Sequence, residues 1–246
     1  MLASQTISTI ASMPSETIAR PATAWTATQL LATAFLLACA AALALMIDAP
    51  VVHFVRDHVW PKDLRHALAV AEVFAWGPSV ALIVVTAVVL DSRSWSVATP
   101  LAIAAAAPGL LADVIKVTVI RSRPSLALAQ GDIQATFVGW LPLLNAHSLG
   151  QPYGSKFQSF PSGHAAVATG LALGLGTLYP RGRWLFLIFA ALAMLQRIDT
   201  QMHFVSDLLA GAALAFFCAS AARWIANANP AYGPLLLGPG NVRPQP

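Results

Sequence analysis

The sequence predicts an all-α, polytopic membrane protein with six transmembrane helices in a bundle, and three observations lead to this fold class. The 246 residues are 57% hydrophobic and only 10% charged, whereas soluble domains carry about a quarter charged residues. The mean hydropathy is +0.68. The apolar residues gather in long runs, and a helix in lipid exposes such residues freely while it satisfies its own backbone hydrogen bonds.

The first run, from Trp25 to Ile47, is long enough to span a bilayer. About 20 residues at 1.5 Å each cross a hydrocarbon core of roughly 30 Å. The apolar region of a secretory signal would be shorter, at roughly 7 to 15 residues. Five further runs, separated by charged or Pro-containing joints, are expected to span at 66–90, 96–119, 162–179, 184–198 and 203–226.

Six spans form one domain, 25–226, and place both chain ends on one side of the membrane. Residues 1–24 are rich in Ser, Thr and Pro and are expected to be a loosely ordered leader. Residues 227–246 are rich in Pro, Gly and Asn, have no helical period and are expected to be a loose polar tail.

The basic residues favour one orientation only slightly. Of the 14 Lys and Arg, six fall on the side of the termini and eight on the other side. Three of those eight, Lys116, Arg123 and Arg197, belong to the motifs below, and without them the balance is six to five. The positive-inside rule then leans toward cytoplasmic termini. No basic stripe with interleaved aromatics occurs, so no nucleic acid partner is expected.

Three clusters of polar residues lie at span ends, all on the same side in the six-span arrangement. In the first, Lys116 and Arg123 are seven residues apart, so on a helix they project within about 20° of each other and both can face one anion. The alternative is a helix end decorated with cations that reach toward the membrane interface. Pro124 fits either reading, because it disfavours the helical conformation at Arg123.

The second cluster, Pro161-Ser162-Gly163-His164, opens an apolar run. Pro suits the first turn of a helix, Gly leaves the backbone open to close approach, and free N–H groups at a helix start bind anions. The alternative is a simple capped helix start in which His164 is incidental.

In the third cluster, His203 and Asp207 are four residues apart, so one helix face carries an imidazole and a carboxylate that fixes its tautomer. Arg197 lies about 240° away on a continuous helix, so its convergence with His203 requires a turn near Asp199 to Met202. The alternative is an Asp–His pair that only joins two helices. An ionisable pair within a span is costly, which favours a functional role.

The clusters together provide three fixed cations, helix N-terminal amides and two histidines, a combination suited to phosphoryl transfer. The sequence has no acidic cluster for Mg²⁺ and no P-loop glycine pattern, so a mechanism without metal or other cofactor is expected.

The three clusters resemble the signature of the type-2 phosphatidic acid phosphatase superfamily, here Lys116-x6-Arg123-Pro124, Pro161-Ser162-Gly163-His164 and Arg197-x5-His203-x3-Asp207. The resemblance covers positions 116 to 207. It implies a six-helix membrane enzyme, in bacterial members an inner-membrane protein whose site faces the periplasm or exterior.

The resemblance also implies a role for each site residue. Lys116, Arg123, Arg197, Ser162 and the Gly163 amide would bind the phosphoryl oxygens. His203 would attack phosphorus to give a phosphohistidine, and Asp207 would orient it. His164 would protonate the leaving oxygen and then help to activate water. Gln196 differs from the family pattern, which often has a small residue at this position. The difference concerns the shape of the substrate that the site accepts.

The expected partners are the bilayer and a lipid phosphate, and the signature leaves several substrates open: phosphatidic acid, phosphatidylglycerophosphate, undecaprenyl diphosphate and lipid A phosphate. Apolar residues between Phe137 and Leu144 are expected to lie at the membrane interface and to shape access. The oligomeric state stays open.

Two other functions remain as alternatives. A vanadate-dependent haloperoxidase is similar around the anion site, but those enzymes are soluble. A transporter or lipid-binding protein would use Glu72 and Asp113 as a polar pathway, but Asp113 is three residues before Lys116, which favours local pairing. Glu72 lies inside the second run, and either a functional role or a structural pairing is expected for it.

Overall fold

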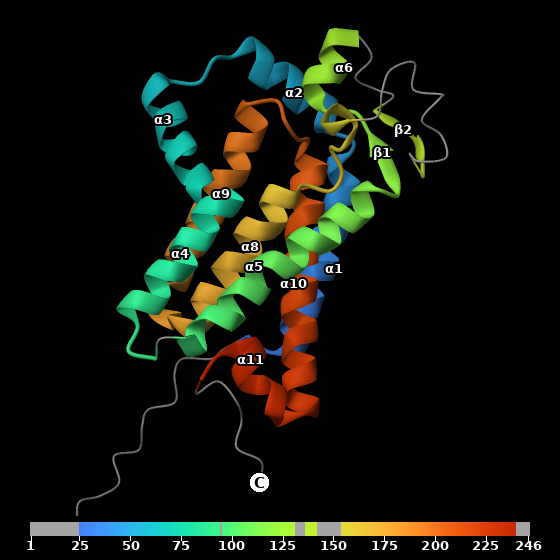
Figure 1. Ribbon diagram of the computed structural model, residues 1–246. Coiled ribbons are helices and arrows are strands. Elements are labelled where there is room, and N and C mark those ends of the chain that lie inside the picture. Colours follow the sequence, from blue (N-terminus) through green and yellow to red (C-terminus); the bar gives the residue numbers. More distant parts are fainter. Residues whose placement is uncertain (1–24, 94, 131–135, 142–153, 240–246) are drawn as a thin grey trace, which may run out of the picture.

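The computed structural model describes residues 25–93, 95–130, 136–141 and 154–239, which form a bundle of helices (Figure 1). The longer helices are α1 (Ala27–Ala44), α4 (Gly77–Leu90), α5 (Trp95–Lys116), α8 (Gly163–Leu178), α9 (Arg183–Asp199) and α10 (Val205–Ala228). The shorter helical elements are α2 (Asp48–Asp57), α3 (Lys62–Ala71), η1 (Glu72–Phe74), α6 (Pro124–Gln130), η3 (Ser155–Phe157), η4 (Pro180–Gly182), η5 (Pro230–Tyr232) and α11 (Gly233–Leu237). Two short strands, β1 (Val119–Arg121) and β2 (Phe137–Trp140), complete the fold.

Fewer helices have spanning length than the sequence predicts. Among the described residues, α1, α5 and α10 are long and apolar enough to cross a membrane, and a fourth span results if α3–η1 and α4 count as one unit bent by 67°. A helix lies at each of the six predicted runs. However, α8 has 16 residues and α9 has 17, below the 18-residue length of such a span. By length and composition, the described residues therefore show three spans, or up to four, and do not show all six that the sequence predicts.

Large apolar side chains are exposed on the outer faces of the long helices. Phe35 on α1, Leu82 on α4 and Leu110 on α5 are 65% to 69% exposed. Such faces would be unfavourable over so wide an area in water but not in hydrocarbon. The chain is therefore a helical membrane protein, as its composition predicts.

The centre of the bundle is formed by α5, α8 and α10, and α1 packs along α10. The backbones of α5 and α8 touch: a Cβ on Gly170 would lie 2.1 Å from the carbonyl oxygen of Ala104. Only glycine permits this approach. Leu101 and Leu171 are fully buried beside it. The close packing holds the start of α8 in a fixed position against the end of α5.

The bend between α3 and α4 brings a carboxylate to α9. Ser79 stabilises the break by donating hydrogen bonds to the carbonyl oxygens of Val73 at 2.6 Å and Trp76 at 2.8 Å. Glu72, in η1, lies next to this break, and η1 packs against α9. Glu72 thereby reaches the last turn of α9, where Arg197 lies.

An antiparallel sheet of β1 and β2 corrects the all-α prediction. Val119 pairs with Trp140 and Ile120 with Gly139, and the register shifts between Ile120 and Arg121. The β-branched side chains of this stretch favour a strand over a continuation of α5. Val138 and Trp140 on β2 are exposed, in keeping with apolar residues at an interface, whereas Leu143 and Leu144 lie outside the described residues.

The C-terminal segment is partly structured, unlike the loose tail expected from its composition. After α10, residues 230–237 form η5 and α11, and α11 packs against α5, α8 and α10. Leu237 is 8% exposed. A single buried apolar residue in a Pro- and Gly-rich stretch carries no helical period, so the sequence pattern misses it. The expected leader, 1–24, and residues 240–246 lie outside the described residues.

Candidate active site

The three polar clusters meet at one end of the bundle. The ends of α5 and α9 and the starts of α8 and α10 all point to the end where β1, α2 and α6 lie, whereas α11 lies at the opposite end (Figure 1). The charges that act on the His164 imidazole come from Arg197, His203, Lys116 and Arg123. Residues that are far apart in the sequence are thus electrostatic neighbours in the fold.

Lys116, the last residue of α5, lies against the start of α8. A Cβ on Gly163 would lie 3.0 Å from Lys116 Nζ, so glycine leaves the space that the ammonium group uses. Lys116 also donates to Asp113 Oδ1 at 2.9 Å. This confirms the local pairing expected from their three-residue spacing.

Arg123 reaches the same site by a different route from the one predicted. Lys116 and Arg123 do not share a helical face, because α5 ends at Lys116 and β1 carries the chain onward. The Arg123 amide donates to the carbonyl oxygen of Lys156 at 2.8 Å, and Pro124 then begins α6. The side chain donates from Nη1 to Met202 Sδ at 3.4 Å, in the turn between α9 and α10.

Arg197 lies in the last turn of α9 and is held by a carboxylate. Its Nη2 group donates to Glu72, and Gln196 Nε2 donates to the other Glu72 oxygen at 3.1 Å. The structural pairing expected as one alternative for Glu72 is therefore present, and Gln196 takes part in it. Arg197 is only 7% exposed, so this pair is shielded from water on the arginine side.

Two donors at the site lack an acceptor. The Nε groups of Arg123 and Arg197 are buried, and neither has a hydrogen-bond partner among the residues that the structure describes. Buried polar groups without partners are rare in proteins. Burial, and next the charge of Arg197, lower the pKa of Arg123. An anion bound between the two guanidinium groups would supply the missing acceptors and relieve the repulsion.

The start of α8 adds backbone donors. Ser162 is the N-cap, fully buried, and its hydroxyl accepts from the Ala165 amide at 3.3 Å. Its own amide donates to the Asp207 carbonyl oxygen at 3.0 Å, which joins α8 to α10. The amides of Gly163 and His164 belong to the first turn, where no preceding helical carbonyl faces them. This turn can therefore receive an anion, as the sequence predicts for a helix start.

The turn between α9 and α10 brings His203 to the site. The amides of Met202 and His203 both lie near the Arg197 carbonyl oxygen, at 3.0 and 3.4 Å. Gln201 has a positive φ of 54°, as expected in a tight reversal. The predicted turn near 199–202 is thus confirmed.

The tautomer of His203 is fixed mainly by a backbone carbonyl. Nδ1 lies 2.8 Å from the Ser159 oxygen, which can only accept, so Nδ1 carries the proton and Nε2 keeps a free lone pair. Asp207 Oδ2 is 3.7 Å from the same Nδ1, too far for a hydrogen bond but close enough for an ion pair. Asp207 therefore acts on His203 as a nearby charge more than as its hydrogen-bond acceptor.

Asp207 itself is completely buried and is fixed by three donors. Ser159 Oγ lies 2.6 Å away, the Phe204 amide 2.9 Å and Arg121 Nη1 2.5 Å. Ser159 thus holds both members of the pair, Asp207 through its hydroxyl and His203 through its carbonyl. Sequence reasoning missed Ser159, although it lies only two residues before the Pro161 motif.

A second buried group missed by sequence reasoning is an ion-pair network around Arg121. Arg121 is 1% exposed and its Nη2 donates to Asp48 Oδ2 at 2.7 Å, while Nη1 contacts Asp207. The guanidinium also lies over two aromatic rings, 4.5 Å from the centroid of Phe137 and 4.2 Å from that of Phe204. An ionisable residue at a span end was the available signal, but its partners are set only by the fold.

In the part of the chain that the structure describes, no group of three or more His, Cys, Asp or Glu side chains is arranged to hold a metal ion. The arrangement instead offers cations, amides and two imidazoles. This combination suits a tetrahedral oxyanion.

A sequence profile of the PAP2 superfamily, the type-2 phosphatidic acid phosphatases that the motifs resemble, matches residues 97–231. The match covers more than half of the chain and includes all eight predicted site residues. Comparison with curated proteins and with solved structures gives no significant match. The helical membrane fold, the meeting of the three clusters and the profile lead to one conclusion: the chain belongs to the PAP2 superfamily of phosphatases.

Proposed function

We propose that the protein is a lipid phosphate phosphatase that hydrolyses a phosphomonoester or diphosphate through a phosphohistidine, without a metal ion. The observation that carries the proposal is the meeting of Lys116, Arg123 and Arg197 with His164 and His203 at one end of the bundle. Membership of the PAP2 superfamily supports the general activity. The intermediate, the individual roles and the substrate are the parts that the experiments below test.

The three cations and the first turn of α8 bind the phosphoryl group in this proposal. The unpartnered Nε groups of Arg123 and Arg197 donate to its oxygens, and Lys116 and the Gly163 amide lie on the side of α8. The Ser162 hydroxyl, which accepts from Ala165, still has its own proton to donate. Fixed donors of this kind stabilise the charge on the equatorial oxygens in the transition state.

His203 starts the reaction. The Nε2 lone pair attacks phosphorus while the bond from phosphorus to the lipid oxygen breaks, which forms an N–P bond and releases the lipid alcohol or lipid phosphate. The positive charge on the imidazole is stabilised by Asp207, 3.7 Å from Nδ1. Arg121 and Ser159 keep Asp207 in place for this role.

His164 moves the protons. Its imidazolium donates a proton to the departing lipid oxygen, and the neutral imidazole then takes a proton from the water that attacks the phosphohistidine. The N–P bond breaks, inorganic phosphate leaves, and both histidines return to their starting states. A bound phosphate dianion favours the charged form of His164 that donates the proton to the lipid oxygen.

The membrane arrangement in this proposal has six spans. At about 1.5 Å per residue, α8 and α9 are close to the lower limit of about 17 residues for a transmembrane helix. Both termini then lie on the cytoplasmic side of a bacterial inner membrane. The candidate site opens at the outer leaflet, within reach of lipid head groups.

Phosphate release by purified protein tests the proposal. Wild-type protein should release phosphate from lipid phosphates with EDTA present, and His203→Ala should not. His66→Ala is a matched control, because His66 is exposed on α3 and outside the motifs. Brief reaction with a ³²P-labelled substrate should label wild-type protein with an acid-labile phosphate. Absence of phosphate release from every lipid phosphate would overturn the proposal, and release without labelling would overturn the intermediate.

Phosphate release from a panel of lipids identifies the substrate. The panel contains phosphatidic acid, phosphatidylglycerophosphate, undecaprenyl diphosphate and lipid A phosphate. The Gln196–Glu72 hydrogen bond of 3.1 Å gives the panel a second use. If Gln196 shapes the site through Glu72, Gln196→Ser should change the order of preference among these lipids. An unchanged order would assign Gln196 a role in the pair alone.

A further inference from the structure

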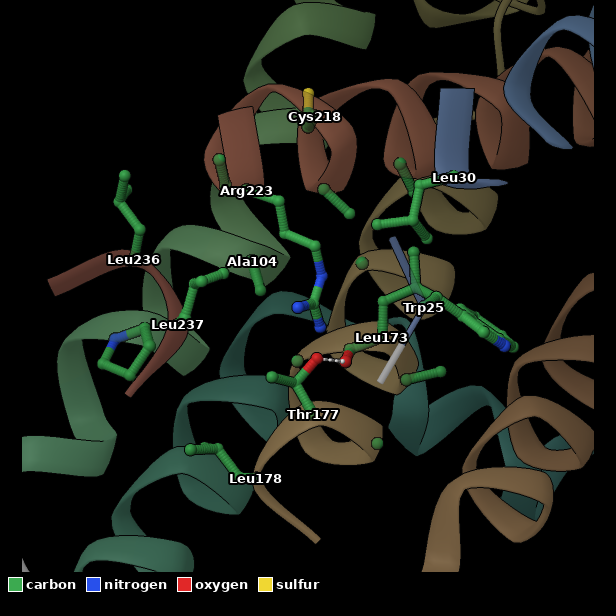
Figure 2. A pocket seen from close by; sticks show the side chains of 18 of the residues that line it. Trp25, Leu30, Ala104, Leu173, Thr177, Leu178, Cys218, Arg223, Leu236 and Leu237 are labelled. Atoms are coloured by element: carbon green, nitrogen blue, oxygen red, sulfur yellow. Dashed lines mark hydrogen bonds between the residues drawn. The ribbon is translucent and has the colours of Figure 1, made fainter. Parts of the chain in front are cut away.

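A separate pocket of about 100 Å³ is lined in part by α11, which lies at the end of the bundle opposite the candidate active site (Figure 1). Figure 2 shows this pocket from close by. Its walls come from α1, α5, α8, α9, α10 and α11. Small residues such as Ala104, Gly174 and Ala219 leave the space open, and Leu30 and Leu173 form an apolar wall. The hydroxyl of Thr177 already donates to the Leu173 carbonyl oxygen at 2.8 Å.

The pocket is poorly suited to water. A water molecule needs about 10–15 Å³ of such space and two to four polar partners. The volume would hold several waters, but the lining is mainly apolar. An apolar occupant, such as part of an acyl chain, matches this lining better.

Two arginines, Arg183 and Arg223, line the pocket, and Arg183 also lies over the Trp184 ring. Figure 2 shows the Arg223 side chain extending from α10 toward Thr177 and Leu173 on α8. Among the described residues, Arg223 has no hydrogen-bond or ion-pair partner, and no acidic side chain acts on it. A half-buried charge without a partner is unfavourable. An anionic ligand in the pocket would remove this cost.

The other arginines on the bundle show how unusual this is. Arg93 pairs with Asp91 at 2.7 Å, Arg121 with Asp48 and Asp207, and Arg197 with Glu72. These three cations each have a carboxylate partner, whereas Arg123, at the candidate active site, has none among the described residues. Arg223 is left for an anion from outside the chain.

The depth of Arg223 matches a lipid head group. It lies 18 residues after Val205 on α10, which is about 27 Å along the helix axis, close to the thickness of a hydrocarbon core. Trp25, which lines the pocket, stacks on Phe216 with the ring centroids 5.8 Å apart. Tryptophan is enriched at this level of a membrane protein, where its ring meets the head groups.

We infer that this pocket binds an anionic phospholipid of the leaflet opposite the active site. The lipid phosphate pairs with Arg223, and part of an acyl chain lies against Leu30, Leu173 and Ala219. The site is separate from the catalytic residues and does not depend on the proposed reaction. Its ligand has a phosphodiester head group with net negative charge, and bound lipid stabilises the junction of α1, α8 and α10.

Native mass spectrometry of the full chain tests this inference. The probes are phosphatidylglycerol and phosphatidylcholine with the same acyl chains, added to detergent-purified protein. Wild-type protein should retain phosphatidylglycerol with at least tenfold higher affinity. Arg223→Gln should lose this preference, and Arg181→Gln should keep it. Arg181 is the matched control, since it is an exposed arginine at the same end that does not line the pocket.

A second variant keeps the charge and fills the space. Ala219→Leu should weaken retention of both lipids. Activity on a water-soluble aryl phosphate reports separately on the proposed function and should be the same in all these variants. Equal retention of the two lipids by wild-type protein, equal behaviour of Arg223→Gln and Arg181→Gln, or unchanged retention by Ala219→Leu would each overturn the inference.

Discussion

The two histidines of the candidate site should respond differently to the leaving group. A general acid matters most when the departing oxygen is strongly basic, and proton donation of this kind contributes about 100- to 10,000-fold in rate. His164→Ala should therefore slow hydrolysis of an alkyl lipid monophosphate more than that of a diphosphate or an aryl phosphate. His203→Ala should abolish turnover of all three, because the N–P bond begins at its Nε2 atom.

Turnover of both variants on the three substrate types decides between the roles, provided that the chemical step is limiting. Equal losses for His164→Ala across the leaving groups would reject its role as acid. Residual turnover by His203→Ala would reject the nucleophile. The tautomer argument gives a further check, since alkylation of the free Nε2 atom should block the reaction.

Glu72 should act on activity through Arg197. In Glu72→Gln the Arg197 guanidinium keeps a neutral partner but loses the opposite charge, so it should be less firmly placed. We expect kcat/KM to fall about tenfold, with a loss of about 1.4 kcal/mol in transition-state stabilisation. Inorganic phosphate should inhibit less strongly to a similar extent.

The control for Glu72 is Asp199→Asn. Asp199 pairs with Arg65 at 3.2 Å at the same end of the bundle, with the arginine half exposed, so its loss should change little. A fall in Tm for Glu72→Gln with unchanged kcat/KM and phosphate inhibition would limit Glu72 to a structural pairing. Unchanged activity and unchanged Tm would leave it without either role.

At the scale of single residues, the motifs identified most of the site residues but not the buried groups that hold them. The spacings in the three motifs placed Lys116, Arg123, Arg197 and the two histidines at one end of the bundle, and the fold brings them together. Arg121 could not be found in this way. Its partners Asp48 and Asp207 are 73 and 86 residues away, and only tertiary packing decides which charges meet.

The elements around the site depend on Arg121. Arg121→Leu leaves Asp48 and Asp207 buried without a cation, and breaking a buried pair costs about 3–5 kcal/mol. We expect a large fall in Tm in detergent, because β1, α2 and α10 lose their common partner. Arg56→Leu is a suitable control, since Arg56 pairs with Asp57 on the surface.

A double variant separates charge from packing. If the uncompensated carboxylates cause the loss, Asp48→Asn should recover part of the Tm in the Arg121→Leu background, although it is destabilising by itself. Additive losses would attribute the effect to the contacts of Arg121 with Phe137 and Phe204 instead.

The stability contributed by the joint between α4 and α5 should depend on pH in the acid range. Asp91 accepts from Arg93 Nη2 at 2.7 Å and from Tyr179 Oη at 2.7 Å, so it connects this joint to the end of α8. The hydrogen bonds from Arg93, and next that from Tyr179, hold the pKa of Asp91 below its ordinary value of 3.8. The carboxylate therefore stabilises the fold above that value and loses the effect as pH falls through the lower, folded-state pKa.

Asp91→Asn should accordingly lower Tm by a constant amount near neutral pH, and the difference should shrink below about pH 4. Tyr179→Phe removes one hydrogen bond and should give a smaller difference. Thermal unfolding followed between neutral and strongly acidic pH measures both. A difference for Asp91→Asn that grows as pH falls would contradict the assigned direction.

Among the elements, hydropathy located the long helices, and the geometry of His203 and Arg197 required the turn at 199–202. The sequence pattern missed the pairing of β1 with β2, because the strands have only three and four residues and lie far apart along the chain. Neither strand is long enough for alternation to be visible. The short α11 was missed for a similar reason, since its packing depends on Leu237.

For the whole molecule, the proposed orientation gives a labelling prediction. Lys62, the first residue of α3, and Lys156, in η3, are exposed at the site end, whereas Arg181, in η4, is exposed at the other end. In a chain whose Cys39 and Cys218 have been replaced by Ser, single cysteines at 62 and 156 should react with an impermeant reagent in intact cells. A cysteine at 181 should react only after the membrane is opened. The reverse pattern would invert the orientation.

The number of spans could not be fixed from hydropathy. The six apolar runs correspond to helices, but α8 is only 16 residues long and the second run is bent by 67°. A run of apolar residues is expected for a helix that contacts lipid and equally for a helix that is buried within the protein. Helix length and direction depend on packing, such as the approach of Gly170 to α5.

The network of Asp48, Arg121 and Asp207 also has a consequence for how the protein is made. Synthesis supplies Asp48 first, Arg121 next and Asp207 only with the start of the last long helix. Until α10 leaves the ribosome, Arg121 has a single acidic partner, and the turn that carries His203 does not exist. The nascent chain thus has no complete site until the start of α10 has been made, and the candidate site can act only after that stage of translation.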